Sequence, residues 1–253
     1  MDLGLAGKNC IILGASRGIG RAIALGLAAE GANVAICARQ EEGLRATESD
    51  LQATGVRVYA GLCDVGDAAA LARFLDTSRQ TLGGVDVLVH NASALAVGPE
   101  LASWEANLQV DLMGAVHACE RVVPWMAAAG GGSILFVSSI AGLEASPNLD
   151  YAYTSVKAAL MAYAKKLATL QAPHGIRVNA IAPGSIEFAG GIWAMVKEHK
   201  PELYGAVRAS IPSGRMGTPE EVADAAVYLL SPRARWVTGV SLAVDGGQHR
   251  GMR

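Results

Sequence analysis

The chain has 253 residues, of which 51% are hydrophobic and 17% are charged, and its formal net charge is −2. This length fits one large α/β domain with a substantial apolar core. The near-neutral charge, with neither a basic stripe nor an acidic tail, argues against nucleic acid or anionic lipid as a partner.

The first ten residues, MDLGLAGKNC, lack the pattern of a secretory signal. No apolar run approaches the roughly 18 residues that a membrane helix needs. We therefore expect a cytoplasmic protein with no membrane partner. The cysteines and histidines show no metal-binding or C-x-x-C spacing, so we expect reduced, buried thiols and no metal site.

Short apolar segments alternate along the chain with segments of helical composition. The strand-like segments are 9–14, 33–38, 56–63, 85–92, 133–139, 176–183 and 240–247. The helix-like segments include 20–31, 41–55, 67–83, 101–129, 153–171 and 218–230. Apolar strands that alternate with helices indicate a parallel sheet covered on both faces. We predict a single α/β domain over residues 1–253, doubly wound and Rossmann-type, with a seven-stranded parallel sheet and helices on both faces. The last helix has a full start signal, with Thr218 as the cap, Pro219 at the first position and Glu221 closing a capping box.

The turn after the first strand is rich in glycine. In ILGASRGIGRA (12–22), Gly14, Gly18 and Gly20 have the spacing G-x-x-x-G-x-G. Backbone N–H groups and a helix N-terminus can approach a pyrophosphate closely only where no Cβ obstructs them. A glycine-rich turn alone is a weak signal, but between a strand and a helix it predicts a dinucleotide site.

The stretch YAYTSVK, residues 151–157, opens a predicted helix. Tyr153 and Lys157 are four residues apart and share a helix face, whereas Tyr151 and Lys157 are six apart and diverge. A phenol with an ordinary pKa of about 10 is a poor base, and a nearby ammonium favours its phenolate form. Tyr153 is therefore the candidate acid–base group.

Together these segments resemble the short-chain dehydrogenase/reductase family, in its short single-domain branch. GASRGIG, CDV, HNAS, VSSIAG, YTSVK, VNAIAPG and VDGG follow the family's order over nearly the whole chain. The resemblance implies an oxidoreductase that transfers a hydride between a nicotinamide dinucleotide and a C=O/CH–OH pair. It further implies that Tyr153 is the acid or base, that Ser139 orients the substrate oxygen, and that Lys157 tunes the tyrosine and holds the ribose.

The resemblance also assigns the residues that bind the cofactor. They are Gly14, Ser16, Arg17, Gly18, Ile19, Gly20, Arg39, Asp64, Val65, Asn91, Ala92, Ser93, Tyr153, Lys157, Pro183, Gly184 and Ile186. An acidic residue after the second strand would hold the ribose of NAD, and this chain has Arg39 there instead. Because Arg39 and Arg17 could clamp a 2′-phosphate, we predict NADP(H), with NAD(H) as the alternative.

Several positions depart from the family pattern. Leu13 replaces a small hydroxyl residue, Ser93 replaces a glycine, and Phe188 replaces a threonine that contacts the carboxamide. Asp111 occupies the place of an asparagine whose backbone carbonyl holds a water in a proton relay to the lysine. Its carbonyl can preserve that relay, and its carboxylate can shift the titration of Lys157. We include Asp111 among the catalytic residues, with a weakened or altered enzyme as the alternative.

The spacing around Ser139 decides which of two neighbouring serines matches the family pattern. Ser139 and Gly142 fit the family's Ser-x-x-Gly pattern, whereas Ser138 does not. The interval from Ser139 to Tyr153 is one residue longer than is common in the family, and we place the extra residue in the loop 143–150.

The segment after the sixth strand is apolar and aromatic, with Phe188, Ile192, Trp193 and Met195. We expect residues 188–210 to form a lid over a small-molecule hydrophobic substrate, a bulky and mostly uncharged ketone or secondary alcohol, with a 3-oxoacyl thioester as one candidate. The alternative is a helix whose apolar face belongs to the ordinary core.

The resemblance implies a homotetramer built through the helices at 101–129 and 153–171 and the C-terminal strand. Two other functions stay open. One is a non-catalytic dinucleotide sensor or scaffold on the same fold. The other is a dehydratase or epimerase, which usually needs a longer chain with a separate substrate domain.

Overall fold

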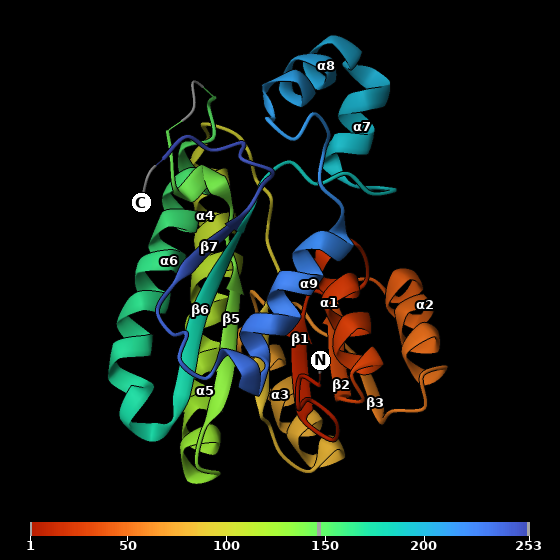
Figure 1. The fold of residues 1–253 in the computed structure, drawn as a ribbon, viewed down its shortest axis with the longest axis vertical. Helices are drawn as coiled ribbons and strands as arrows, with labels where there is room; N and C mark the ends of the chain where they lie inside the picture. Colours follow the sequence, from red (N-terminus) through yellow and green to blue (C-terminus); the bar gives the residue numbers. More distant parts are fainter. Residues whose placement is uncertain (1, 146–147, 252–253) are drawn as a thin grey trace.

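The computed structural model describes residues 2–145 and 148–251. Seven strands form one parallel sheet in the order β3-β2-β1-β4-β5-β6-β7 (Figure 1). The strands are β1 (Asn9–Leu13), β2 (Asn33–Ala38), β3 (Val58–Leu62), β4 (Val87–His90), β5 (Gly132–Val137), β6 (Ile176–Pro183) and β7 (Ser241–Val244). The prediction of a seven-stranded parallel sheet is confirmed. The chain reverses its direction across the sheet between β3 and β4, which leaves a topological switch point between β1 and β4.

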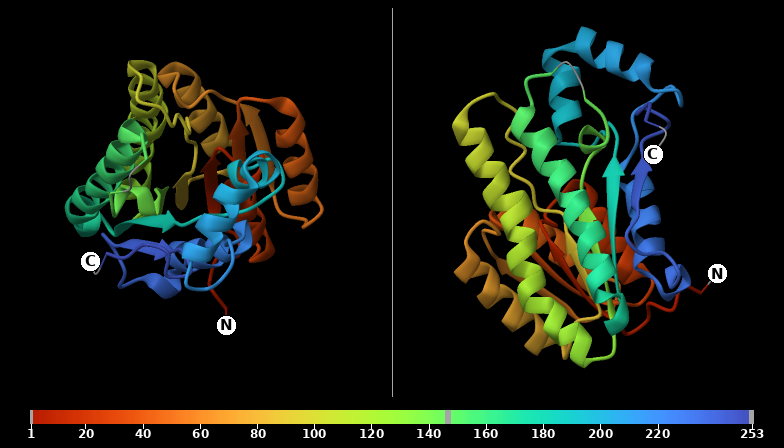
Figure 2. Two further views of the ribbon diagram at one scale, coloured as in Figure 1. Left: turned by 90° about the horizontal axis from the view of Figure 1, so that it is seen from above. Right: turned by 90° about the vertical axis from the view of Figure 1, so that its left-hand side faces the viewer.

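Helices cover both faces of the sheet, as predicted (Figure 2). One face packs against α1 (Gly18–Ala29), α2 (Glu41–Gln52) and α9 (Pro219–Leu230), and α1 lies directly against α9. The other face packs against α3 (Ala68–Leu82), α5 (Gly114–Ala128) and α6 (Tyr151–Gln171). Successive strand residues point to opposite faces, so Ile12 joins the first core while Ile11 and Leu13 join the second. This double burial is the reason that the strands are continuously apolar in sequence.

The predicted helix over 101–129 is present, but it is not α-helical throughout. It consists of α4 (Leu101–Asn107), a π-helix, η1 (Leu108–Met113), and α5. The π-helical turn contains Asp111, and such turns occur frequently at functional sites. No proline or glycine lies within 108–113, so the composition gave no sign of the change in hydrogen bonding.

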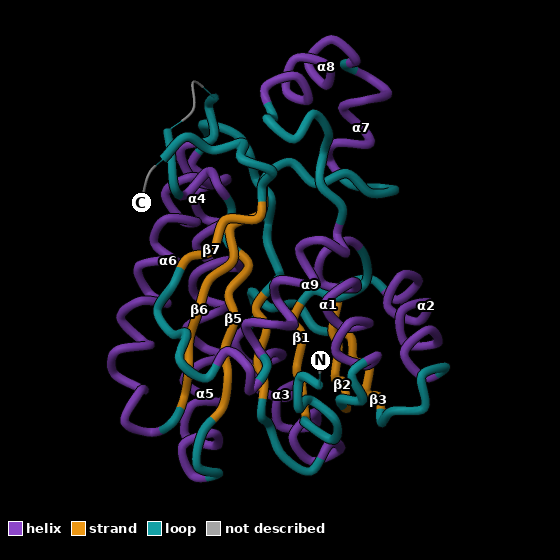
Figure 3. Tube along the Cα trace, viewed as in Figure 1, coloured by secondary structure: helices purple, strands orange, loops and turns teal. Residues whose placement is uncertain are grey.

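Several short elements complete the described chain. They are the 3-10 turns η2 (Ile140–Gly142), η3 (Ala172–His174) and η4 (Pro232–Ala234) and the helices α7 (Ile192–His199) and α8 (Pro201–Ser210). The capping box predicted for Thr218 and Glu221 is present at the start of α9. Figures 1 and 3 show α7 and α8 beyond the carboxyl ends of the strands.

The four cysteines are buried free thiols, as expected. In the described parts of the chain, no helix is both long and apolar enough to cross a membrane.

Candidate active site

The glycine turn joins β1 to α1 at the carboxyl edge of the sheet. Gly14 and Gly18 have positive φ angles of 83° and 56°, a region that favours glycine. A Cβ on Gly14 would lie 2.8 Å from the Cα of Ala92, and one on Gly20 would overlap Asn91 and the Gly14 carbonyl. Asn91 Nδ2 donates to that carbonyl at 2.5 Å, so the end of β4 supports the turn. The first turn of α1 has no acidic residue, and the turn therefore fits an anionic ligand such as a pyrophosphate.

The ends of β2 and β3 lie beside this turn. Arg39 is exposed immediately after β2. After β3, Val65 is buried, and the Asp64 carboxylate accepts a hydrogen bond from the Gly66 N–H at 2.9 Å. Arg17 Nη1 donates to the carbonyl of Gly190 at 2.8 Å, so this side chain links the glycine turn to the segment that leads into α7.

The two serines at the end of β5 have different surroundings. Ser138 is buried, and its Oγ donates to the Lys157 carbonyl at 2.9 Å, which ties the strand to α6. Ser139 is half-buried, and its Oγ accepts a hydrogen bond from the Ala141 N–H at 3.2 Å. The Ser139 hydroxyl therefore keeps its own hydrogen available to bind an oxygen. Part of the loop that was expected to hold an extra residue, positions 146–147, lies outside the described residues.

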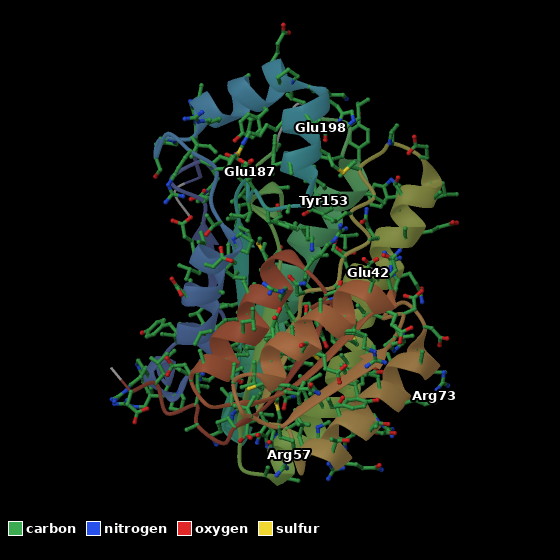
Figure 4. All side chains as sticks on the ribbon, turned by 90° about the vertical axis from the view of Figure 1, so that its right-hand side faces the viewer. Glu42, Arg57, Arg73, Tyr153, Glu187 and Glu198 are labelled. Carbon is green, nitrogen blue, oxygen red and sulfur yellow. The ribbon has the colours of Figure 1, made fainter. Side chains whose placement is uncertain are left out.

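Tyr153 and Lys157 lie together on α6. The Lys157 Nζ is 5.5 Å from the centre of the Tyr153 ring, and it donates to the Val137 carbonyl at 3.1 Å. Tyr153 is half-buried, whereas Tyr151 is 53% exposed. In Figure 4, Tyr153 lies on the side of Glu187 and Glu198, at the end of the molecule opposite Arg57 and Arg73.

Asp111 enters this group from the π-helix. Its carboxylate has no solvent exposure, and its Oδ1 lies 3.0 Å from the Lys157 Nζ. The Ser93 Oγ donates to the same oxygen at 2.6 Å, and the Ala94 N–H donates to Oδ2 at 2.8 Å. The Asp111 carbonyl accepts a hydrogen bond from His90 Nε2 at 2.9 Å, and its second lone pair leaves room for the expected water. The sequence indicated a carboxylate near Lys157, but it did not reveal the contacts of that carboxylate with Ser93 and Ala94.

Several known proteins are similar to this chain over nearly its whole length. A family model described as enoyl-(acyl carrier protein) reductase matches residues 14–249. Isoepoxydon dehydrogenase of Penicillium expansum is 35% identical over 257 residues, covering 99% of this chain and 98% of that protein. L-sorbose reductase of Gluconobacter frateurii, solved with NADPH and L-sorbose, has a TM-score of 0.91 at 33% identity, with both chains fully covered. A 7α-hydroxysteroid dehydrogenase, solved with NADH and 7-oxo glycochenodeoxycholic acid, has a TM-score of 0.92 at 32% identity, covering 100% of this chain and 98% of that one.

The chain belongs to the short-chain dehydrogenase/reductase family. It is therefore an oxidoreductase of that family, as the sequence resemblance predicted.

The electrostatics of the site follow from burial and from the Asp111 carboxylate. Burial by itself lowers the pKa of Lys157, but the charge of Asp111, followed by Tyr153, raises this pKa above its ordinary value. Lys157 therefore stays an ammonium. Burial lowers the pKa of His90 to about 4, which keeps the imidazole neutral near pH 7. A neutral His90 must carry its proton on Nε2 in order to donate to the Asp111 carbonyl.

The loop after β6 has a support that the sequence analysis missed. Gln248 Nε2 donates to the Ser185 hydroxyl at 2.9 Å, while Gln248 Oε1 accepts from the Ser185 N–H at 2.8 Å. A Cβ on Gly184 would collide with Asp245, so the C-terminal segment packs closely on the loop. The neighbouring Gly-Gly pair at 246–247 indicates a turn in the sequence, but it does not indicate that this segment packs on the loop after β6.

Phe188, which stands where the family usually has threonine, packs against the glycine turn. Its ring occupies the space that a Cβ on Gly18 or Gly191 would fill. Beyond it, Glu187 accepts hydrogen bonds from Lys197 at 2.7 Å and from the Tyr204 hydroxyl at 2.5 Å. Through these contacts, Glu187 in the loop after β6 holds both α7 and α8. Ile192 and Met195 on α7 are 43% and 57% exposed.

Proposed function

We propose that this chain transfers a hydride between NADP(H) and a hydrophobic ketone or secondary alcohol. The cofactor class, a nicotinamide dinucleotide, follows from family membership. The observation that carries the proposal is the placement of Tyr153 and Lys157 on one face of α6, beside the end of the strand that carries Ser139. The glycine turn, which has no room for a Cβ at Gly14 or Gly20, fits the pyrophosphate of the cofactor.

Each polar group has a separate task in this scheme. When bound, the nicotinamide supplies or accepts the hydride. The Ser139 hydroxyl holds the substrate oxygen. During reduction, the Tyr153 hydroxyl gives its proton to that oxygen, and during oxidation the Tyr153 phenolate removes it. The Lys157 ammonium stabilises the phenolate, and the N–H that Val137 and Asp111 do not engage is available to the cofactor ribose. Asp111 acts through Lys157.

The preference for NADP(H) rests on charge. Arg39 follows β2 directly, no acidic residue stands beside it, and Arg17 lies on the glycine turn. We expect Arg39→Ala to raise KM for NADPH by roughly tenfold or more, because a charge-assisted contact with the 2′-phosphate is lost, while KM for NADH changes little. Initial rates with each cofactor measure this. Arg45→Ala is the matched control, because Arg45 pairs with Glu41 and Glu48 on α2. Equal effects of Arg39→Ala on both cofactors would contradict the preference.

The preference for a hydrophobic substrate rests on the lid, residues 188–210. Ile192 and Met195 are exposed on α7, at the carboxyl edge where substrates of doubly wound sheets bind. Ketones and 3-oxoacyl thioesters of increasing chain length, tested under one set of conditions, should show kcat/KM rising with apolar size. A preference for short, polar ketones would contradict this part of the proposal.

Replacing the tyrosine tests the reaction itself. We expect Tyr153→Phe to lower kcat on the best substrate by at least about a hundredfold, since the general acid–base group is removed, while NADPH still binds. Nicotinamide absorbance follows turnover, and fluorescence titration follows binding. Tyr151→Phe should keep the parental kcat. Parental kcat in Tyr153→Phe would refute the mechanism, whereas cofactor binding by the parental protein without turnover of any substrate would favour a sensor.

The proposed assembly is a homotetramer. Apolar side chains are exposed along the helices expected at its interfaces, including Leu101, Leu108, Met113 and Leu170, and on β7, at Leu242. Light scattering in solution tests this, with an expected mass of four times the 26.0 kDa chain.

A further inference from the structure

The Asp111 carboxylate is held by three donors from two segments, the loop after β4 and α6. Lys157 Nζ lies 3.0 Å from Oδ1, Ser93 Oγ donates to Oδ1 at 2.6 Å, and the Ala94 N–H donates to Oδ2 at 2.8 Å. All of these groups gather around a side chain with no solvent exposure. Both oxygens of this buried carboxylate therefore accept from a donor, as a buried polar group requires.

The Ser93 hydroxyl has its direction fixed by the backbone. It accepts a hydrogen bond from the Leu95 N–H at 3.2 Å, so its own hydrogen points to the Asp111 carboxylate. Leu95 has a positive φ of 50°, which is unfavourable for a leucine. Asn107 holds the same loop by donating to the Ala96 carbonyl at 2.8 Å. The loop is thus fixed with its donors directed at Asp111.

The ion pair of Asp111 and Lys157 changes how strongly the Lys157 ammonium can stabilise a Tyr153 phenolate. Asp111 Oδ1 lies within 3.0 Å of Lys157 Nζ, whereas the Tyr153 ring centre lies 5.5 Å from the same nitrogen. An isolated ammonium stabilises a phenolate strongly, but an ammonium paired with a carboxylate does so less.

We propose that Ser93 is a positioning residue that keeps the Asp111 carboxylate on the Lys157 ammonium, and that this buried ion pair sets the pH at which Tyr153 exchanges its proton. The inference rests on the proposed function of Tyr153. The titratable groups around the pair are Tyr153 on α6 and His90 on β4, and β5 adds only the Val137 carbonyl. His90 is neutral and faces the Asp111 backbone, so it adds no charge.

The test compares Asp111→Asn and Ser93→Ala with the parental protein. In Asp111→Asn the ammonium loses its carboxylate, so the pH profile of kcat for alcohol oxidation should move to lower pH by roughly one unit. Ser93→Ala should move the profile in the same direction by less, because the carboxylate is still present but less firmly held. Ser93→Thr keeps a hydroxyl and should restore the parental profile. Ser103→Ala is the matched control, since Ser103 donates to Glu100 outside the pair.

A second measurement needs no cofactor or turnover. Ultraviolet titration of tyrosinate, with the Tyr153→Phe protein subtracted, isolates the ionisation of Tyr153. Its midpoint should move to lower pH in Asp111→Asn. Unchanged midpoints and unchanged kcat profiles in both variants would overturn the inference, and so would a loss of rate that is equal at every pH. Retained activity in Tyr153→Phe would instead overturn the proposed function.

Discussion

His90 is a buried side chain that contacts the site and also makes the stability of the fold depend on pH. The imidazole is 1% exposed, donates to the Asp111 carbonyl and meets Phe136 edge-on. Its Nδ1 has no hydrogen-bond partner among the described residues. A second proton on this ring would put a charge out of reach of water, which is why burial lowers the pKa of His90 to about 4.

This pKa makes the stability of the fold depend on pH. The pKa of His90 falls from 6.5, its ordinary value, to about 4 on folding. The unfolded chain therefore binds a proton first as the pH drops, and stability is lost between pH 6.5 and 4. We expect the free energy of unfolding to lose about 2 kcal/mol from this group between pH 7 and pH 5. Urea unfolding at both values should show that loss in the parental protein and not in His90→Asn. His174→Asn is the control, because His174 is exposed, and it should show the same loss of unfolding free energy as the parental protein. The same loss in His90→Asn would contradict the assignment.

At the scale of elements, the catalytic strand end and the catalytic helix meet at a glycine. Gly142 closes η2, and a Cβ there would lie 2.7 Å from the Ala158 nitrogen and 2.8 Å from the Lys157 carbonyl carbon. Both are backbone atoms of α6, which cannot rotate away as a flexible side chain could. The glycine of the Ser-x-x-Gly pattern therefore lets η2 lie directly on the helix.

Gly142→Ala should push η2 away from α6 and separate Ser139 from Tyr153. We expect a loss of roughly 1–3 kcal/mol in stability, as in overpacked cores, together with a fall in kcat. Thermal unfolding and initial rates measure the two effects. Gly205→Ala is the matched control, because a Cβ there meets nothing within 4 Å and lies within α8. The free energy of unfolding of Gly205→Ala should rise by about 0.5–1 kcal/mol, because alanine loses less conformational freedom in a helix than glycine. Equal stabilities of the two variants would show that the contact with α6 does not matter.

The strands and most helices could be predicted because their signals are local. The five inner strands are buried on both faces, so their apolar runs are continuous. These runs extend past the hydrogen-bonded ladder, and β4 covers Val87–His90 rather than 85–92. The π-helix could not be predicted, because a shift in backbone hydrogen bonding leaves the composition of 108–113 unchanged.

The same distinction between local and distant signals applies to the site. Tyr153 and Lys157 share a helix face through their spacing alone, and the sequence was sufficient to pair them. The contact of Ser93 with Asp111 joins a loop after β4 to a helix 18 residues later, and that of Ser185 with Gln248 spans 63 residues. Such contacts depend on the folded path of the chain and leave no periodic pattern in the sequence.

In the molecule as a whole, two helices that are far apart in the sequence cover each other. α1 packs against α9, and a Cβ on Gly26 would lie 3.0 Å from a methyl group of Val227. Ile23 and Leu27 of α1 share one core with Val222 and Ala226 of α9. During translation, α1 leaves the ribosome long before its covering helix has been made. A nascent chain therefore exposes this apolar stripe until α9 has been synthesised, and exposed apolar surface of this kind favours aggregation in that interval.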